Sequence, residues 1–226
     1  MRSQRRLVRP EIASAVLPSL YNGLLAGFHF DELSGTPNDF VGSLTPTLNG
    51  VTQGVSGKFD KAIQIEIGQV SLGTNSLLGG LSACTIAAWT RWNGISDNAT
   101  NIASSLGGSR MYAFSNGYIA IYLLGNVLYE KVFGGLPSSS IDTEWALSIM
   151  EWDGSTIRYI QNNITSPDTI ITPTGTIQKG TNEVIGGGWR GFQRSHQDID
   201  EVLYWNRPLT IDEKTNLWND GNGITL

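Results

Sequence analysis

Short segments in which apolar and polar residues alternate recur along most of this chain. Residues 61–67 (KAIQIEI) show the pattern clearly, since three isoleucines fall on one side of an extended strand while Gln64 and Glu66 fall on the other. Asn-Gly, Gly-Asn and Asp-Gly pairs separate several of these segments and favour tight hairpin turns. The pattern therefore predicts about a dozen short antiparallel strands, arranged as a sandwich or a barrel.

The strand predictions cover most of the chain after residue 23. Residues 31–50 are rich in turn-forming residues and are expected to be a long loop. Residues 1–20 have no clean strand or helix period, so they are expected to form an arm outside a domain that spans residues 21–226. The predicted strands span residues 24–30, 61–67, 84–92, 101–106, 110–115, 118–124, 127–133, 144–152, 156–162, 168–177, 182–187 and 198–206.

One helix is predicted near the C-terminal end of the chain. Thr210 is followed three residues later by Glu213, which makes a capping box, and the glycines after position 220 can end the helix. Ile211 and Trp218 lie seven residues apart and therefore on one face. This face is expected to lie against the sandwich.

Composition limits the classes of function. The chain has 226 residues, 40% apolar and 15% charged, which suits one large domain with a full core. The net charge of −5 argues against binding to nucleic-acid phosphates, and no apolar stretch is long enough to span a membrane. No export signal is expected, because Pro18 and Asn22-Gly23 interrupt the apolar segment near the start. The single Cys84 excludes a disulfide framework and is expected to be a small buried apolar residue.

The charge is distributed unevenly. Arg2, Arg5, Arg6 and Arg9 are the only charged residues before Glu11, and removing these four positive charges takes the net charge from −5 to −9. A basic arm on an acidic body is typical of a segment that contacts another molecule. A solvated terminus without a partner is the other interpretation, and both stay open.

Five segments, which overlap the predicted strands and helix, together have the sequence pattern of one protein family. They are LLAGFHFDELSGT (24–36), GKFDKAIQI (57–65), TIAAWTRW (85–92), EWALSIMEWDGSTIRYIQNN (144–163) and IDEVLYWNRPLTIDEKTNLWNDG (199–221). In this order they resemble the laminin G-like, concanavalin A-like lectin and glucanase family. The resemblance implies an all-β, antiparallel concanavalin A-like jelly-roll sandwich with one short C-terminal helix and an N-terminal arm. Two positions depart from the family pattern: Ser43 follows Gly42 where Asn is frequent, and Leu203 replaces a usual charge.

Asp198, Asp200 and Glu201 place three carboxylates within four residues. Some relatives in this fold are glycan hydrolases, and glycoside hydrolysis needs two carboxyl groups that face one sugar. Alternate residues of a strand share a face, so Asp198 and Asp200 are expected to lie with Val202, and Glu201 with Leu203 on the other side. The three-acid ladder is therefore broken, and although a two-acid site stays geometrically open, the chain is expected not to be an enzyme. Apolar residues on both faces favour a strand that is covered on both sides.

A buried Asp200 needs a partner, which can be loop amides, an arginine or a cation. The family resemblance implies a structural calcium near such acidic turns. Asp31, Asp39 and Asp200 are the candidate oxygen ligands. The alternative is that backbone amides bind these carboxylates without a metal.

The seven tryptophans raise the question of a sugar-binding platform. Most of them fall on predicted strands or on the helix. Trp189 differs, because it lies in the glycine-rich segment GGGWRGFQRSH with Arg190 and Arg194 close by, and loops on rigid scaffolds often carry function. These three residues are the candidate ligand-binding site, and the alternative is a packed loop anchor.

Three functions are consistent with these observations. The preferred hypothesis is a non-catalytic virion structural protein of a bacterial virus, a head decoration or tail-associated subunit assembled in the host cytoplasm. Its partners would be other virion proteins or copies of itself, with the arginine arm lacing subunits and Leu203 and Trp205 adding an apolar contact. The alternative is a stand-alone carbohydrate-binding module or adhesin that binds surface glycans, outside the cell or at its surface. A glycan hydrolase is the third and least favoured hypothesis.

Overall fold

The computed structural model describes residues 15–42, 44–73, 77–92, 100–106, 109–113, 118–123, 127–132, 144–162, 168–171, 176–187 and 197–226. Within this part of the chain the helices are η1 (Pro18–Tyr21), α1 (Ile211–Trp218) and η2 (Asn219–Gly221). The strands are β1 (Leu24–Phe28), β2 (Thr47–Ser56), β3 (Lys61–Gly73), β4 (Cys84–Trp92), β5 (Thr100–Leu106), β6 (Ser109–Ala113), β7 (Tyr118–Leu123), β8 (Val127–Val132), β9 (Ala146–Trp152), β10 (Thr156–Gln161), β11 (Asp168–Ile171), β12 (Thr181–Ile185) and β13 (Gln197–Trp205). No helix among these residues is long and apolar enough to cross a bilayer.

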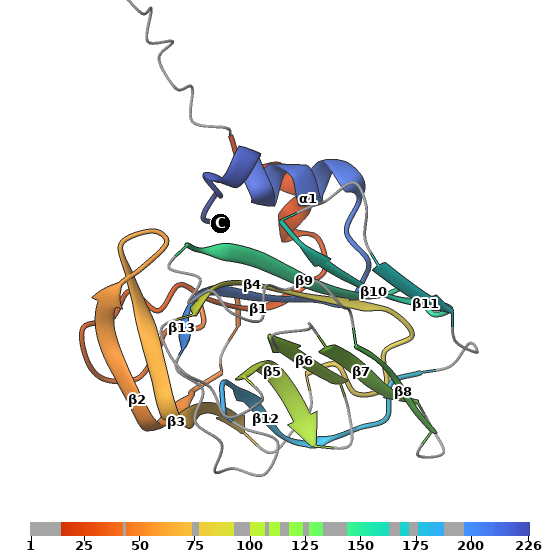
Figure 1. Ribbon diagram of the computed structural model, residues 1–226, viewed down its shortest axis with the longest axis horizontal. Coiled ribbons are helices and arrows are strands. Elements are labelled where there is room, and N and C mark those ends of the chain that lie inside the picture. Colours follow the sequence, from red (N-terminus) through yellow and green to blue (C-terminus); the bar gives the residue numbers. More distant parts are fainter. Residues whose placement is uncertain are drawn as a thin grey trace, which may run out of the picture.

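The strands are antiparallel and form two stacked layers, which confirms the predicted jelly-roll sandwich (Figure 1). They follow the order β11-β10-β9-β4-β13-β3-β12-β5-β6-β7-β8, with β1 paired to β13 and β2 paired to β3. β3 joins the layers, because Ile63 and Ile65 pair with β13 while Val70 and Ser71 pair with β12. Most predicted strands agree with the structure to within about two residues, the margin expected for strand ends.

The main core lies between the two layers. Its large members include Phe28, Trp152 and Tyr204, which are all completely buried. Cys84 also lies in this core, as predicted, and burial raises the pKa of its thiol far above the usual value. A buried aromatic side chain removes a large apolar area from water, so this cluster is the main source of stability.

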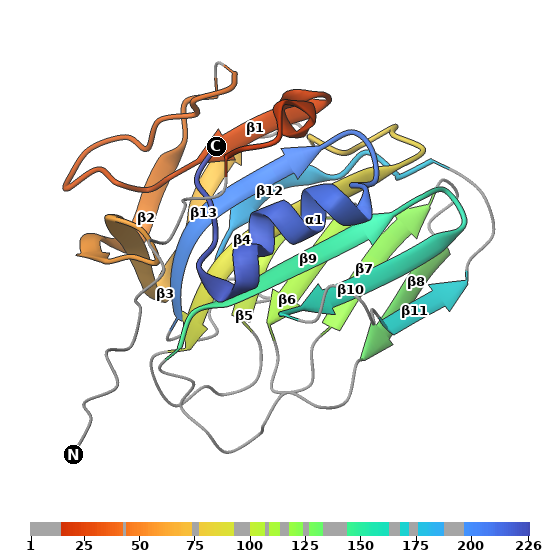
Figure 2. The ribbon, with the colours of Figure 1, turned by 90° about the horizontal axis from the view of Figure 1, so that it is seen from above.

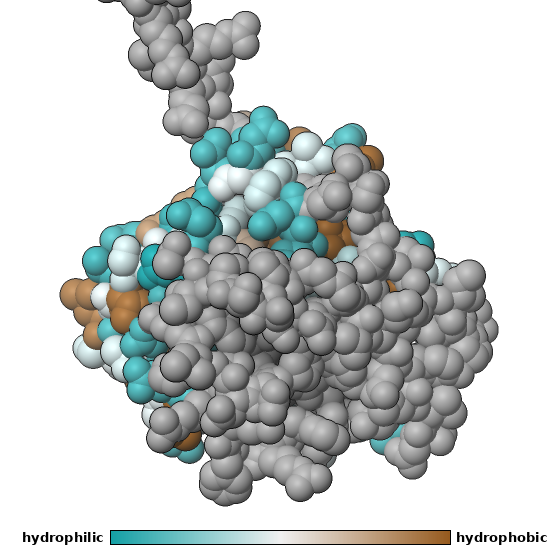
Figure 3. Space-filling model, in the orientation of Figure 1, coloured by the Kyte–Doolittle hydropathy of each residue, from teal (hydrophilic) through white to brown (hydrophobic). Residues whose placement is uncertain are grey.

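A second apolar cluster lies on the opposite face of the β9-β4-β13 layer, beneath α1 (Figure 2). Trp89, Leu203 and Trp205 extend from the strands, and Leu217 and Trp218 meet them from the helix. The Trp89 and Trp218 rings stack with centroids 5.7 Å apart. The outer surface of the helix is coloured mainly hydrophilic in Figure 3, as expected for a helix with one face on the core.

The predicted capping box begins α1. The Thr210 hydroxyl accepts from the Glu213 amide, and the Glu213 carboxylate accepts from the Thr210 amide at 2.8 Å. The prediction that Ile211 shares the buried face is wrong, because Ile211 is 51% exposed and Leu217 makes the contact instead. Asn219 ends the helix in a left-handed conformation, two residues before Gly221, the first of the predicted glycines.

β2 was not predicted, and the reason is visible in its pairing with β3. Gly50 and Gly54 have positive φ angles, and the register shifts beside each of them, so apolar residues do not alternate cleanly along the strand. At the first shift the side chains of β3 also exchange faces, so that Ile65 and Val70 both point into the core although they are an odd number of residues apart. Ile67 is therefore 49% exposed, although simple alternation placed it with the buried isoleucines.

Residues 15–21 belong to the folded domain, which corrects the predicted boundary of the arm. Leu20 is completely buried in the cluster beneath α1. Its carbonyl accepts from Trp205 Nε1 at 2.7 Å, while the Asn216 side chain bonds to Leu17 N and to Ala15 O at 2.9 and 3.0 Å. The arm is thus limited to residues before Ala15. Arg2, Arg5, Arg6 and Arg9 lie outside the described residues.

This anchoring leads to a prediction about truncation. A chain that starts at Asn22 should lose about 2–4 kcal/mol of stability, because the buried Leu20 side chain and the partner of Trp205 Nε1 are both removed. A chain that starts at Ala15 is the matched control and should unfold like the full chain. Urea unfolding of the three chains measures this, and equal midpoints for all three would contradict the anchoring role.

Candidate functional site: the acidic closing strand

β13 carries the three predicted carboxylates, but a β-bulge changes the faces they occupy. Asp200 pairs with Trp89 and Leu203 with Ala87, so two residues of β13 oppose one residue of β4. Glu201 has a φ of 50° at this point. The alternation prediction is therefore wrong beyond Asp200, since a bulge shifts the side-chain period by one.

The bulge divides the strand between the two cores. Ile199, Val202 and Tyr204 face the core between the layers. Asp198 and Asp200 face the α1 side, on which Leu203 also lies. All nine residues of β13 are buried, so the prediction of a strand covered on both sides is confirmed.

Asp198 is held by an arginine from the neighbouring strand. Arg91 Nε and Nη2 both donate to Asp198 Oδ2, at 3.0 and 2.7 Å, and Gln64 Nε2 donates to Oδ1 at 3.1 Å. Asp198 is only 2% exposed, and the charged guanidinium of Arg91 compensates the burial of its carboxylate. The sequence analysis assigned no role to Arg91, although its place two residues after Trp89 put it on the same face.

Asp200 holds the turn that precedes β3. Lys58 N and Phe59 N donate to its Oδ2 at 2.8 and 3.1 Å. A Cβ at Gly57 would lie 2.8 Å from that oxygen, so the turn needs a glycine there to approach so closely. Burial raises the pKa of the Asp200 carboxyl to about 7, although the Phe59 and Lys58 amides favour its charged form.

Glu201 pairs with a histidine of the first strand segment. His29 Nδ1 lies 2.8 Å from Glu201 Oε1, and the imidazole stacks on Phe40 with centroids 4.3 Å apart. The hydrogen bond to Glu201 raises the pKa of His29, while burial raises the pKa of Glu201. The pair ties the bulge to the segment that follows β1.

The candidate calcium ligands Asp31, Asp39 and Asp200 each accept hydrogen bonds from different backbone amides. Asp31 Oδ1 accepts from Lys61 N at 2.9 Å, close to the turn that Asp200 holds. Asp39 instead accepts from Gly27 N of β1 and from Val41 N of its own loop. Among the described residues, no three His, Cys, Asp or Glu side chains lie together as metal ligands would. The calcium site stays a prediction.

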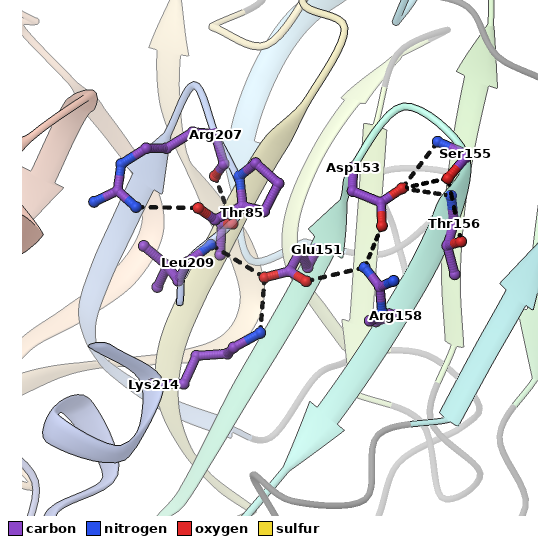
Figure 4. Close-up of polar contacts among 10 residues, drawn as sticks. Thr85, Glu151, Asp153, Ser155, Thr156, Arg158, Arg207, Leu209 and Lys214 are labelled. Atoms are coloured by element: carbon purple, nitrogen blue, oxygen red, sulfur yellow. Dashed lines mark hydrogen bonds and ion pairs between the residues drawn. The ribbon is translucent and has the colours of Figure 1, made fainter. Parts of the chain in front are cut away.

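A further buried acid, Glu151 of β9, fastens α1 to the sheet (Figure 4). Its Oε2 accepts from Lys214 Nζ at 3.0 Å and from Leu209 N at 3.1 Å, and its Oε1 accepts from Arg158 Nη1 at 3.2 Å. The Glu151 carboxylate and the Lys214 ammonium are both removed from water and compensate each other, so removing either side chain would leave a buried unpaired charge and would be costly. The sequence analysis missed this network, because its members are up to 63 residues apart and share no motif.

The structure describes the predicted subunit-contact residues but not the predicted ligand-binding residues. Leu203 and Trp205 are 2% and 0% exposed beneath α1, so the prediction that they form a subunit contact is wrong for these side chains. The α1 helix and residues 15–21 cover the surface that they would have offered. Trp189, Arg190 and Arg194 lie outside the described residues, and their role in ligand binding stays a prediction.

The fold and its closing strand agree with a comparison to protein families. A laminin G model, described as the concanavalin A-like lectin/glucanases superfamily, matches residues 66–213. This chain belongs to that family. The matched range contains the tryptophan strand β4, the β9-β10 hairpin, β13 and the start of α1. No curated protein matches the sequence.

Solved structures with a similar fold are binding domains of clostridial toxins. The binding domain of Paraclostridial Mosquitocidal Protein 1 is 15% identical, with a TM-score of 0.71 over 89% of this chain and 53% of that chain. The botulinum neurotoxin DC binding domain, in complex with rat synaptotagmin II, is 14% identical with a TM-score of 0.67 over 89% and 52%. A structure of botulinum neurotoxin type C, whose cell entry is described as dependent upon interaction with two ganglioside molecules, is 14% identical with a TM-score of 0.65 over the same shares. This chain spans about half of each of these chains.

The raised pKa of Asp200 generates a prediction with a definite sign. The unfolded carboxyl titrates near pH 4, so the contribution of Asp200 to stability is present below about pH 4 and is lost as the pH rises through about 7. Asp200→Asn keeps an oxygen for the Lys58 and Phe59 amides without the charge. We expect this variant to exceed the wild type by up to about 4 kcal/mol at pH 8, with the difference shrinking toward pH 4.

Asp200→Ala is the control for the hydrogen bonds, because it removes the charge and the acceptor together. It should be less stable than Asp200→Asn by about 1–3 kcal/mol at every pH. Thermal melts from pH 4 to pH 8 measure both effects. Parallel pH profiles for the wild type and Asp200→Asn would show that Asp200 is not the titrating group.

Proposed function

We propose that this chain is a non-catalytic binding module. The observation that carries the proposal is that each carboxylate of β13 already holds a structural partner: an arginine for Asp198, a turn for Asp200 and a histidine for Glu201. A glycoside hydrolase needs two carboxyl groups that are free to act on either side of a sugar bond. Acids that fasten β4, the 57–59 turn and the β1 segment to the closing strand are unsuited to that role.

The comparisons support binding as the general function. The toxin domains with similar folds are described as binding domains, and individual structures contain a protein receptor or concern gangliosides. Their identity of 14–15% carries the fold alone, so the ligand of this chain follows from its own surface. A glycan is the ligand class we favour, since the family includes lectins.

Binding without turnover is directly measurable. We expect the full chain to be retarded in native gels that contain neutral polysaccharides and to release no new reducing ends from them. Wild type, Asp198→Asn and Asp200→Asn are compared in both assays. Reducing ends that appear with the wild type and disappear in both variants would overturn the non-catalytic assignment.

A second candidate function is that of a structural subunit in a bacterial virus particle. The observation that favours it is the anchor at residues 15–20, which holds the base of the arginine-bearing segment firmly against α1. Fourteen residues precede this anchor and can reach at most about 46–50 Å when fully extended, enough to contact a neighbouring subunit. The basic segment and the acidic body have complementary charges, which favours association between copies.

Light scattering tests this second function. The full chain should associate at low salt and less so at high salt, since exposed charge pairs are screened. A chain that starts at Ala15 keeps the anchor, lacks the four arginines and should stay monomeric at both salt concentrations. Equal association of the two chains would remove the arm from the assembly hypothesis.

A further inference from the structure

A row of side chains crosses the sheet on its α1 side, just beyond the end of the helix. The strand register places Thr52 of β2 opposite Gln64 of β3, Gln64 opposite Asp198 of β13, and Asp198 opposite Arg91 of β4. Trp145, immediately before β9, continues the row, because Thr90 and Ala146 are the preceding pair. Directly paired residues share a face, so these five side chains lie side by side.

Arg91 and Trp145 form the firm end of this row. The guanidinium lies 4.8 Å from the centre of the indole ring and is fixed in place by its two bonds to Asp198 and by Nη2, which donates to Ser56 O at 3.0 Å. Asp198 is buried, whereas the Arg91 side chain is 25% exposed and Trp145 is partly exposed. The row therefore presents a preorganised cation on β4 and an aromatic ring at the start of β9.

Hydrogen-bonding groups along the row remain available. Nη1 of Arg91 makes no hydrogen bond within the described part of the chain, where Nε and Nη2 make all of the Arg91 bonds. Gln64 gives one amide hydrogen to Asp198 and keeps its carbonyl oxygen as an acceptor. A role in folding alone would require only the buried edge of Arg91. Arg91 Nη1 and the Gln64 carbonyl oxygen, on side chains that are partly exposed beside an aromatic ring, suit a ligand rich in hydroxyl groups.

The length and charge of the row restrict that ligand. Gln64 and Trp145 are three strand spacings apart, or roughly 14 Å at about 4.8 Å each. That distance suits a short oligosaccharide better than a single sugar ring. Asp198 neutralises Arg91, and the exposed Glu144 lies next to Trp145, so the row has no net positive charge for an acidic sugar.

We propose that the row Gln64–Asp198–Arg91–Trp145 is a binding site for neutral oligosaccharides, with the chain of sugars lying across the strands. One sugar ring packs against the part of Trp145 that Arg91 and the cluster beneath α1 leave exposed, and its hydroxyl groups accept from Arg91 Nη1. The next sugar donates a hydroxyl to the Gln64 carbonyl oxygen. The site rests on the proposed function of a non-catalytic binding module, and it lies apart from Trp189, Arg190 and Arg194 in the sequence.

The test uses the full chain on an array of immobilised neutral oligosaccharides, with glucose, galactose, mannose and N-acetylglucosamine series, and with sialylated and sulfated glycans beside them. We expect the wild type to bind at least one neutral series. Trp145→Ala should weaken that binding about tenfold, because the contact with the indole ring and the support that the ring gives to Arg91 are both lost. Gln64→Ala, which leaves the Arg91–Asp198 pair intact, should weaken it several-fold.

Tyr21→Ala is the matched control, because Tyr21 is an aromatic residue that is 53% exposed on η1, outside the row. It should bind like the wild type. Thermal melts establish that each variant is folded, and Gln64→Ala keeps the test decisive if Trp145→Ala unfolds. Wild-type binding to no neutral glycan, binding to acidic glycans only, or equal binding by Trp145→Ala, Gln64→Ala and the wild type each overturns the site. The last result leaves the binding module standing, whereas glycan turnover would overturn the module itself.

Discussion

Burial of the closing strand on both faces is the constraint on which the rest of this molecule depends. β13 pairs with β1, β3 and β4, and all nine of its residues are buried. A carboxylate in such a position is costly unless charge or hydrogen bonds compensate it. Asp198, Asp200 and Glu201 therefore act as attachment points that bring Arg91, the turn before β3 and His29 to the strand. Acidity and burial together determine which segments meet at the centre of the fold.

The bulge at Glu201 allows one strand to serve two cores. Val202 and Tyr204 enter the core between the layers, and Leu203 and Trp205 enter the cluster beneath α1. The second cluster is then closed by α1 and by residues 15–21, with Glu151 holding Lys214 of the helix. Farther along the same face, the Gln64, Arg91 and Trp145 side chains of the paired row are partly exposed. The helix thus covers the structural part of this face, and the proposed binding row lies outside that part.

Which features were predictable follows from the range of the interactions involved. Turn chemistry and alternation act over a few residues, so the β4 bounds and the capping box of α1 were predicted correctly. β2 was missed and Ile67 was misplaced, because glycine bulges changed the period of side chains along β2 and β3. The bulge at Glu201 altered the predicted faces of β13 for the same reason. Arg91 and the Glu151–Lys214 pair were missed, since their partners come from strands and a helix that are distant in the sequence.

The sequence by itself determined the class of fold, because hairpin turns, alternating segments and a capped helix are local signals that add up along the chain. It also determined that the acids of the closing strand would need partners, since the same short segment contains three carboxylates and the apolar residues that favour its burial. Only the tertiary structure decided which partners they have, which face each side chain occupies and where the domain begins. These outcomes depend on register and bulges, and a shift of one residue exchanges the two faces of a strand. For Leu20, Leu203 and Trp205 the decision came from packing against α1, an interaction that no local pattern contains.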